Sequence, residues 1–298
     1  FNTSYFLNCC KKLCSKFKLN RFKTLNKMII IRYSEIALKG KKRMDFQKTL
    51  VSNIKRVLKK EFGLKLKIKS EWGRIFIESD SQKVAKRVAK IFGVVSTSVS
   101  IQSSSDLEEI KGAVINLCKN VKKVKSFAVR VKRVGTHPYT SIDVAKDVGR
   151  VIKEVFKFKV DLNNPELEIG IEIREDFSYI FTNYSTFKGY GGLPVGTQER
   201  VLSVISDEKS ILSTWYALKR GCDVDLLFST NIDIKKVKPI LDFWACYRNI
   251  YTISSKGNIK DLLQYAFSLK YKGIFCSIVS NELPNIIEIL KKREMPVF

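Results

Sequence analysis

Apolar and polar residues follow helical and strand spacing in turn along the first hundred residues. The apolar run at 28–33 (MIIIRY) is typical of a buried strand. Residues 42–62 carry apolar side chains three and four positions apart and end at Gly63, as a helix does. The further elements predicted here are strands at 64–68 and 74–78, a helix at 81–92 and a strand at 94–101. This order predicts a ferredoxin-like domain over 28–100.

A second α/β unit is predicted over residues 101–188. Its elements are helices at 105–120 and 141–156, a strand at 126–132, and strands at 167–173 and 178–184 that read as a hairpin. A glycine-rich linker at 189–200 follows, in which Gly189, Gly191, Gly192, Pro194 and Gly196 fall close together.

Strand–helix repeats replace this pattern over residues 201–298. The pairs are 201–205 with 210–220, 223–228 with 233–247, 250–253 with 258–270, and 273–279 with 281–292. Consecutive βα units predict a small, doubly wound parallel sheet, because right-handed crossovers place the helices on its faces. The expected fold class is therefore α/β and α+β in three parts.

Positive charge is concentrated in the first hundred residues. The chain carries a formal net charge of +26, from 55 Lys and Arg against 29 Asp and Glu. Residues 1–27 hold 7 basic and 0 acidic residues and residues 28–100 hold 18 and 6, so +19 lies there. Such a footprint favours a polyanionic partner such as nucleic acid, or an acidic membrane surface. A solvated lysine-rich surface is the alternative.

Residues 1–27 lack periodicity, and the first methionine is Met28. They are interpreted as a basic tail or an over-extended start, with a transit peptide or an RNA-binding arm as alternatives. Cys9, Cys10 and Cys14 lie there without a second set of ligands, so no metal site is predicted.

Several function classes are excluded by composition. No run approaches the roughly 18 apolar residues needed to cross a bilayer, so no membrane partner is expected. The 7 cysteines lack Cys-x-x-Cys pairing, which predicts a reducing compartment and a cytoplasmic location. A single histidine, His137, rules out a zinc protease motif with two histidines.

Three blocks resemble the tRNA 4-thiouridine synthetases, the tRNA sulfurtransferases that also occur in thiamine biosynthesis. The blocks are 32–40 (RYSEIALKG), 127–138 (FAVRVKRVGTHP) continued by 160–165 (VDLNNP), and 189–197 (GYGGLPVGT). Their order and spacing match the family from residue 28 to about 200. The resemblance implies a ferredoxin-like domain, a THUMP domain at 101–188 and a PP-loop ATP-pyrophosphatase domain, the layout that periodicity also predicts.

The resemblance further implies that the first two domains recognise the acceptor end of tRNA. Arg130 and Lys132 alternate with valines on a strand and so share one face, and Arg133 extends that patch at its end. A second candidate patch lies at a strand–helix junction and comprises Lys39, Lys41, Lys42 and Arg43. Solvated side chains or salt bridges are the alternative for both patches.

The family pattern fails at the nucleotide loop. A PP-loop reads Ser-Gly-Gly-x-Asp-Ser, and its glycines let backbone N–H groups approach a pyrophosphate. The chain instead has Ser206, Asp207, Glu208, Lys209 and Ser210, one residue short when counted back from Gly221. Carboxylates replace both glycines, so we expect Ser206 or Asp207 to cap the helix and no ATP cofactor to bind.

Sulfur transfer also lacks a clear nucleophile in this sequence. Cys276 is the one candidate for a catalytic thiol, and small buried cysteines are the usual explanation for such residues. The sequence therefore favours a tRNA-binding member without its own ATP-pyrophosphatase activity, serving a partner enzyme or forming a homodimer. The alternatives are an active tRNA sulfurtransferase using ATP and Mg²⁺ with an atypical loop, and a membrane- or rRNA-associated protein.

Overall fold

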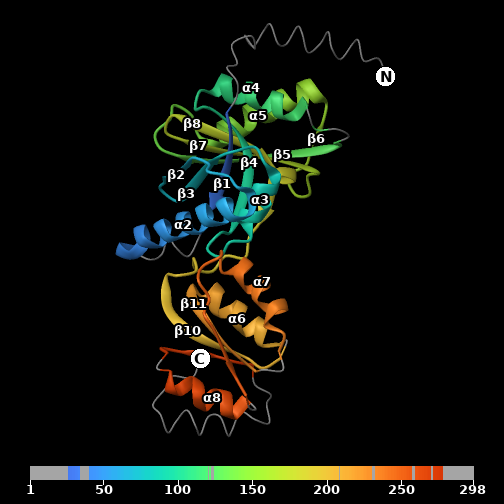
Figure 1. Ribbon diagram of the computed structural model, residues 1–298. Helices are drawn as coiled ribbons and strands as arrows, with labels where there is room; N and C mark the ends of the chain where they lie inside the picture. Colours follow the sequence, from blue (N-terminus) through green and yellow to red (C-terminus); the bar gives the residue numbers. More distant parts are fainter. Residues whose placement is uncertain are drawn as a thin grey trace. The chain divides into compact units, whose positions relative to one another are not determined.

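The computed structural model describes residues 26–33, 40–119, 121, 124–207, 209–229, 232–256, 259–269 and 271–277 (Figure 1). They form two compact units that do not follow chain order. The first comprises the described residues up to Ile31 with Lys67–Lys86 and Thr97–Phe187; the second comprises Arg32–Leu66, Arg87–Ser96 and those from Lys188 on. The predicted helix at 281–292 and all but the end of the predicted tail lie outside the described residues.

Nine strands of the described chain form one mixed sheet, on which the first unit is built. The path through it is β2-β3-β1-β4-β8-β7-β5-β6, and β9 pairs with β4. The strands are β1 (Lys27–Arg32), β2 (Ile68–Glu71), β3 (Arg74–Glu78), β4 (Ser96–Ser104), β5 (Ser126–Val134), β6 (Lys159–Val160), β7 (Leu167–Arg174), β8 (Phe177–Thr182) and β9 (Thr186–Lys188). A short 3-10 turn, η4 (Asn183–Ser185), separates the last two.

Strands β5 and β7 pair in parallel, with Val129 opposite Ile169 and Val131 opposite Ile171. Helices α4 (Leu107–Lys119) and α5 (Ser141–Phe156) lie side by side against these strands (Figure 1). The isoleucines of β7 on that face are fully buried against the two helices. Side chains alternate across a strand, so residues between these apolar positions point to the other face.

Helix α5 begins and ends where the sequence predicts. Thr140 Oγ1 accepts a hydrogen bond from Asp143 N at 3.2 Å, and Asp143 Oδ2 accepts one from Thr140 N at 2.9 Å. This reciprocal cap satisfies backbone donors that the helix itself leaves open. Lys157 takes a left-handed conformation at φ 58° and ends the helix.

The second unit contains a parallel sheet of four described strands in the order β12-β11-β10-β13. They are β10 (Gln198–Ile205), β11 (Cys222–Ser229), β12 (Thr252–Ser255) and β13 (Ile274–Phe275). The helices of this unit are α6 (Lys209–Lys219), α7 (Ile234–Trp244), α8 (Ile259–Ser268) and, earlier in the chain, η3 (Gly40–Lys42) and α2 (Arg43–Phe62). Helix α3 (Gln82–Ala89) belongs to the first unit up to Lys86 and to the second unit from Arg87 on.

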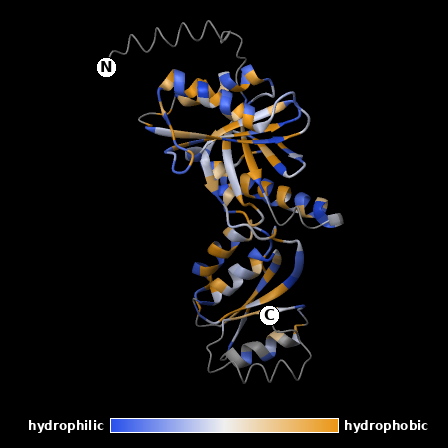
Figure 2. Ribbon diagram, turned by 180° about the vertical axis from the view of Figure 1, so that it is seen from behind, coloured by the Kyte–Doolittle hydropathy of each residue, from blue (hydrophilic) through white to orange (hydrophobic). Residues whose placement is uncertain are grey.

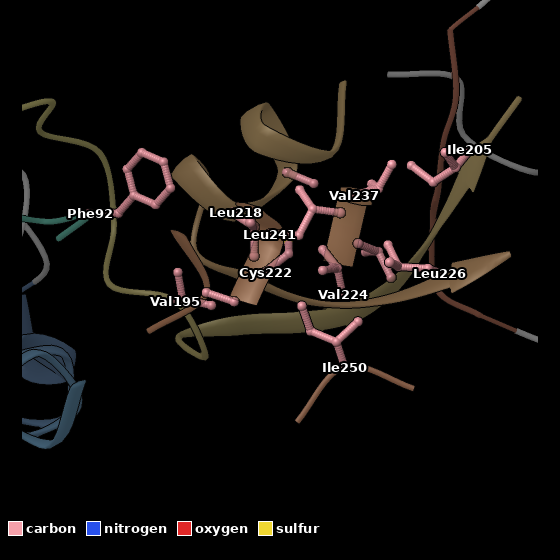
Figure 3. Close-up of a cluster of buried hydrophobic side chains, with 13 residues drawn as sticks. Phe92, Val195, Ile205, Leu218, Cys222, Val224, Leu226, Val237, Leu241 and Ile250 are labelled. Carbon is pink, nitrogen blue, oxygen red and sulfur yellow. The ribbon is translucent and has the colours of Figure 1, made fainter. Parts of the chain in front are cut away.

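Two apolar clusters, one on each face, hold this sheet. One packs β10 and β11 against α6 and α7 and includes Leu218, Leu226 and Leu241 (Figure 3). The other packs Leu202, Val204 and Leu227 against Ala266 of α8. Figure 2 shows the apolar stretches of the strands between these layers. Apolar residues on both faces of a strand are the mark of a doubly wound sheet, so the predicted fold class is confirmed.

The glycine-rich segment after the first unit is hydrogen-bonded into the second. Gly189 N donates to Val95 O at 2.7 Å, and Gly191 N donates to Val94 O at 2.9 Å. A Cβ at Gly189 would overlap the carbonyl oxygen of Val94, so only glycine permits this approach.

The strand predicted at 64–68 forms later, as β2 at Ile68–Glu71. Its antiparallel partner β3 ends at Glu78, opposite the start of β2, where Glu78 N donates to Lys67 O. Leu64, Lys65 and Leu66 therefore lie beyond the end of β3, and the predicted strand begins about four residues too early.

Candidate functional site

Asp207 caps helix α6 at the place of the predicted nucleotide loop. Its Oδ1 accepts from Ser210 N at 2.8 Å and from Ser210 Oγ at 2.7 Å. The buried Ser210 Oγ in turn accepts from Asp207 N at 3.3 Å and from Ser206 N at 3.2 Å. Lys209 is exposed, and Glu208 lies outside the described residues. The chain's own carboxylate thus occupies the position where a helix end otherwise attracts a bound anion.

Asp207→Ala is expected to destabilise the second unit by about 1 kcal/mol, because Ser210 N and Ser210 Oγ lose the side-chain carboxylate that accepts from both at the helix start. Urea unfolding followed by tryptophan fluorescence measures this, since Trp215 and Trp244 both pack in that unit. Lys209→Ala, an exposed change one residue before Ser210, serves as the matched control and should stay within about 0.5 kcal/mol of the parent. Equal stability of the two variants would show that Asp207 does not cap the helix.

The structure places Arg130 and Lys132 on one face of β5, away from the buried isoleucines of β7. The Arg130 side chain is 46% exposed, with Nη2 donating to Leu162 O at 2.5 Å and Nε 3.5 Å from Glu168 Oε2. A long contact between exposed charges is weak. Both cations therefore remain available to a polyanion.

Arg133 lies on the opposite face of β5 from Arg130 and Lys132. It is paired in register with Ile173, on the side that α4 and α5 cover, and its Nη1 donates to Gly135 O at 2.9 Å. Odd and even positions of a strand point apart, so Arg133 does not extend the patch as the sequence interpretation held.

The junction patch is described only in part. Lys42 is exposed, whereas Arg43 is 8% exposed at the start of α2. Lys39 and the side chain of Lys41 lie outside the described residues. Of this patch, Lys42 alone is placed by the structure where it can meet a ligand.

Family models match two parts of the chain: the ThiI ferredoxin-like domain at residues 28–98 and the THUMP domain at residues 104–183. The probable tRNA sulfurtransferase of Methanocaldococcus jannaschii is 31% identical over 288 residues, which is 91% of this chain and 74% of that protein. The chain belongs to the tRNA sulfurtransferase family. Other relatives include the probable tRNA sulfurtransferase of Caldanaerobacter subterraneus, 36% identical over 67% of this chain and 53% of its own length. The chain thus spans about half the length of the first such relatives.

Solved structures agree with this assignment to the tRNA sulfurtransferase family. The PH1313 protein of Pyrococcus horikoshii matches with a TM-score of 0.77 and 30% identity over 91% of this chain and 93% of its own. A 4-thiouridine synthetase, solved as an RNA complex with bound ATP, matches with a TM-score of 0.65 and 25% identity over 91% of this chain and 72% of its own.

The described cysteines of this tRNA sulfurtransferase family member lie where burial disfavours the thiolate. Burial raises the pKa of the Cys276 thiol to about 11 and the pKa of the Cys246 thiol to about 12. Burial also raises the pKa of Cys118 to about 12, and raises that of Cys222. Sulfur transfer uses thiolates, so the place of Cys276 beside Ile274 favours packing over catalysis. No described group of His, Cys, Asp and Glu side chains is arranged to hold a metal ion.

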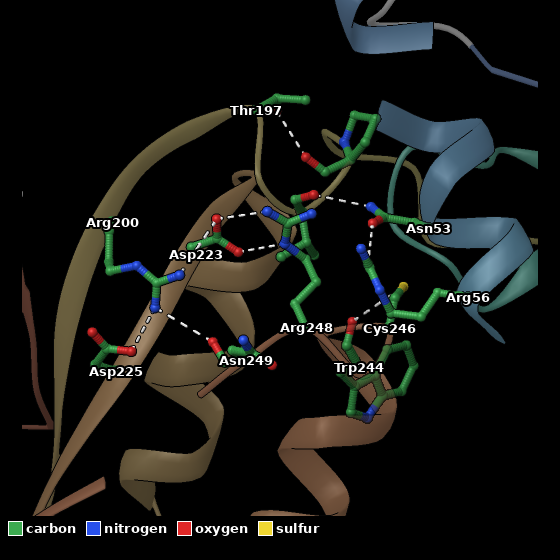
Figure 4. A network of polar contacts seen from close by, with 12 residues as sticks. Asn53, Arg56, Thr197, Arg200, Asp223, Asp225, Trp244, Cys246, Arg248 and Asn249 are labelled. Atoms are coloured by element: carbon green, nitrogen blue, oxygen red, sulfur yellow. Dashed lines mark hydrogen bonds and ion pairs between the residues drawn. The ribbon is translucent and has the colours of Figure 1, made fainter. Parts of the chain in front are cut away.

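The sequence interpretation missed an arginine network at the amino end of the small parallel sheet (Figure 4). Arg248 Nε and Nη2 donate to Asp223 at 2.5 and 2.8 Å, and Arg200 Nη1 donates to Asp225 Oδ1 at 2.6 Å. Arg56 of α2 donates to Asn53 Oδ1 at 3.1 Å. These residues come from separate segments, and no motif or spacing in the sequence connects them.

None of the described helices is long and apolar enough to cross a membrane. This agrees with the hydropathy of the sequence, in which apolar runs are short.

Proposed function

We propose that this chain is a tRNA-binding member of the tRNA sulfurtransferase family that does not itself hydrolyse ATP. Membership of the family and the matches to its ferredoxin-like and THUMP domains support the first half. The 4-thiouridine synthetase of similar fold was solved with RNA. The excess of basic residues over residues 1–100 suits a ligand whose backbone is negatively charged.

The exposed face of β5 carries the proposed RNA contact in the first unit. Arg130 and Lys132 stand two residues apart on an extended strand, so their side chains are spaced along one line. Guanidinium groups bind phosphate through two parallel hydrogen bonds and also stack on unpaired bases, which suits single-stranded RNA ends. We propose the acceptor end of tRNA as the part that is bound.

The cap between Asp207 and Ser210 carries the second half of the proposal. A nucleotide's phosphate would need the backbone N–H of Ser210 as a donor, and this N–H already donates to Asp207 Oδ1 at 2.8 Å. A phosphate oxygen about 4 Å from that carboxylate is repelled by roughly 4 kcal/mol at an effective dielectric constant of about 20. The residues present at this helix end therefore fit a protein cap rather than ATP, and no reaction step is assigned to a nucleotide.

Isothermal titration calorimetry with Mg-ATP tests this directly. We expect no heat of binding up to millimolar nucleotide, in a sample that binds tRNA in a parallel titration and is therefore folded. Binding of Mg-ATP at micromolar concentration would refute the absence of an ATP site while leaving the tRNA half intact.

An active tRNA sulfurtransferase is the second candidate, because the RNA-bound neighbour of similar fold also holds ATP. It requires the chain to form 4-thiouridine, either alone or completed by a second subunit. Mass spectrometry of tRNA nucleosides from a deletion strain decides the point: loss of 4-thiouridine favours this candidate, and an unchanged level removes it.

A further inference from the structure

A polar cavity of about 380 Å³ opens at the amino end of the small parallel sheet. The described residues that line it are polar or charged and comprise Arg56, Arg200, Asp223, Tyr247, Arg248 and Asn249. The size falls at the lower end of the range for small-ligand sites. Three guanidinium groups around one polar space point to an anion as the ligand (Figure 4).

Two of the three arginines already have carboxylate partners. Arg248 binds Asp223 through both Nε and Nη2 and lies against Gly196, where a Cβ would overlap its guanidinium group. Arg200 binds Asp225 and lies 3.8 Å from Asp223. These pairs hold the cavity wall in one arrangement, because bidentate contacts fix the guanidinium plane.

Arg56 differs from the other two arginines. Among the described residues, no carboxylate lies within ion-pair distance of it, and its hydrogen bond goes to the neutral amide of Asn53 at 3.1 Å. Asn53 is itself fixed, since its Nδ2 donates to Val195 O at 2.9 Å. A guanidinium has five N–H donors, so most of those on Arg56 remain for a ligand.

The charge around the cavity leaves an excess of positive charge. Among the described residues that line the cavity or pair with its arginines, three arginines stand against two carboxylates, Asp223 and Asp225, which is an excess of one positive charge. Burial and the nearby charge of Arg248 lower the pKa of Arg56. A second cavity of about 370 Å³ shares Tyr247, Arg248 and Asn249. Its wall adds Lys60 and the ion pair of Lys238 with Asp242 at 2.7 Å, so it too has more positive than negative charge. A bound anion relieves the repulsion between Arg56 and Arg248.

The loop that carries this wall holds an unusual backbone. Cys246 and Tyr247 both adopt φ 55°, in the left-handed region that non-glycine residues rarely occupy. Hydrogen bonds from Tyr247 N to Asp242 O at 2.8 Å and from Arg248 N to Ala245 O at 3.1 Å keep them there. Strained residues of this kind concentrate at ligand sites, where the surrounding structure fixes them.

We propose that Arg56, Arg200 and Arg248 form a phosphate-binding site at the amino end of the small parallel sheet, whereas the capped start of α6 follows the carboxyl end of β10. The ligand class is a phosphate group. Each guanidinium can donate two parallel hydrogen bonds to two oxygens of one phosphate, whereas a halide offers only one acceptor atom. Either a phosphodiester of bound RNA or a small phosphate compound supplies this chemistry. The site stands on its own geometry and does not depend on RNA binding by the first unit.

Calorimetric titration of the whole chain with inorganic phosphate at constant ionic strength tests the site. We expect millimolar or tighter binding, about tenfold weaker in Arg56→Gln, since a lost charge-assisted contact is worth more than 1.4 kcal/mol. Lys55→Gln, the same loss of charge on the adjacent exposed position of α2, is the matched control and should bind like the parent. Arg56→Lys, which keeps the charge without the fork, should fall between them.

Absence of phosphate binding by the parent protein overturns the site, as does equal affinity of Arg56→Gln and Lys55→Gln. Melting temperatures without phosphate show whether Arg56→Gln is folded, and the Arg56→Lys measurement replaces it if it is not. Titration of the same variants with tRNA separates the two sources. A parallel loss of tRNA affinity identifies an RNA phosphodiester, whereas unchanged tRNA affinity identifies a small phosphate compound; the first unit's role is tested separately by Arg130 and Lys132.

Discussion

Raising the salt concentration from about 50 to about 200 mM is expected to weaken tRNA binding by about a thousandfold, if at least six phosphates are neutralised. The physical reason is the release of counterions from RNA when lysine and arginine side chains replace them. Fluorescence anisotropy with a labelled tRNA transcript, repeated at several salt concentrations, gives the slope of log affinity against log salt.

Arg130→Gln and Lys132→Gln should each lower the steepness of that slope by about 1, because each removes one phosphate contact. Arg150→Gln is the matched control: it removes one exposed arginine from α5, on the side of the sheet that the helices cover. Arg133→Gln should resemble the control, since Arg133 points to that same side. A shallow slope in the parent chain, or equal slopes in all four variants, would contradict the proposed surface on β5.

Asp225→Ala is expected to destabilise the second unit by about 3 kcal/mol, because removing one partner of a buried ion pair strands the other. The Asp225 side chain is 4% exposed and accepts from Arg200 at 2.6 Å, from Tyr251 N at 3.1 Å and from the Tyr271 hydroxyl at 2.8 Å. Arg200 is 37% exposed and regains water when Asp225 is lost, which keeps the effect near the lower end of the known range.

Urea unfolding followed by tryptophan fluorescence in a Trp72→Phe background measures this change. Trp215 and Trp244 then report on the second unit alone, since the sequence has 3 tryptophans. Asp45→Ala, which removes an exposed carboxylate 3.9 Å from Lys48 in the same unit, is the control and should change stability by less than about 1 kcal/mol. A loss below about 1 kcal/mol for Asp225→Ala would show that the hydrogen bonds around it are replaced by water.

The helices and strands were largely predictable because the spacing of apolar residues in the sequence differs between the two kinds of element. The helix at 141–156 was placed to the residue, since its apolar face and its boundary residues give the same limits. The cap of α6 was narrowed to Ser206 or Asp207, and only the hydrogen bonds to Ser210 select Asp207. The domain limits drawn at residues 100 and 188 remain predictions.

For the candidate binding surfaces, the sequence could predict only which residues of a single strand share a face. Alternation placed Arg130 and Lys132 together, and the same rule, applied strictly, assigns Arg133 to the other face. The sequence by itself also determined the family, because the three sequence blocks and their order can be compared with relatives without knowing the fold.

The tertiary structure alone decided which charges meet across the second unit. Arg56, Arg200 and Arg248 come from α2, β10 and the loop before β12, and their common cavity exists only once these segments pack. It likewise decided that Cys276 is a partly buried thiol whose pKa is raised, because the pKa of a side chain depends on its surroundings rather than on its neighbours in sequence. Periodicity encodes contacts between residues a few positions apart, whereas electrostatic and solvent environments arise from contacts between distant segments.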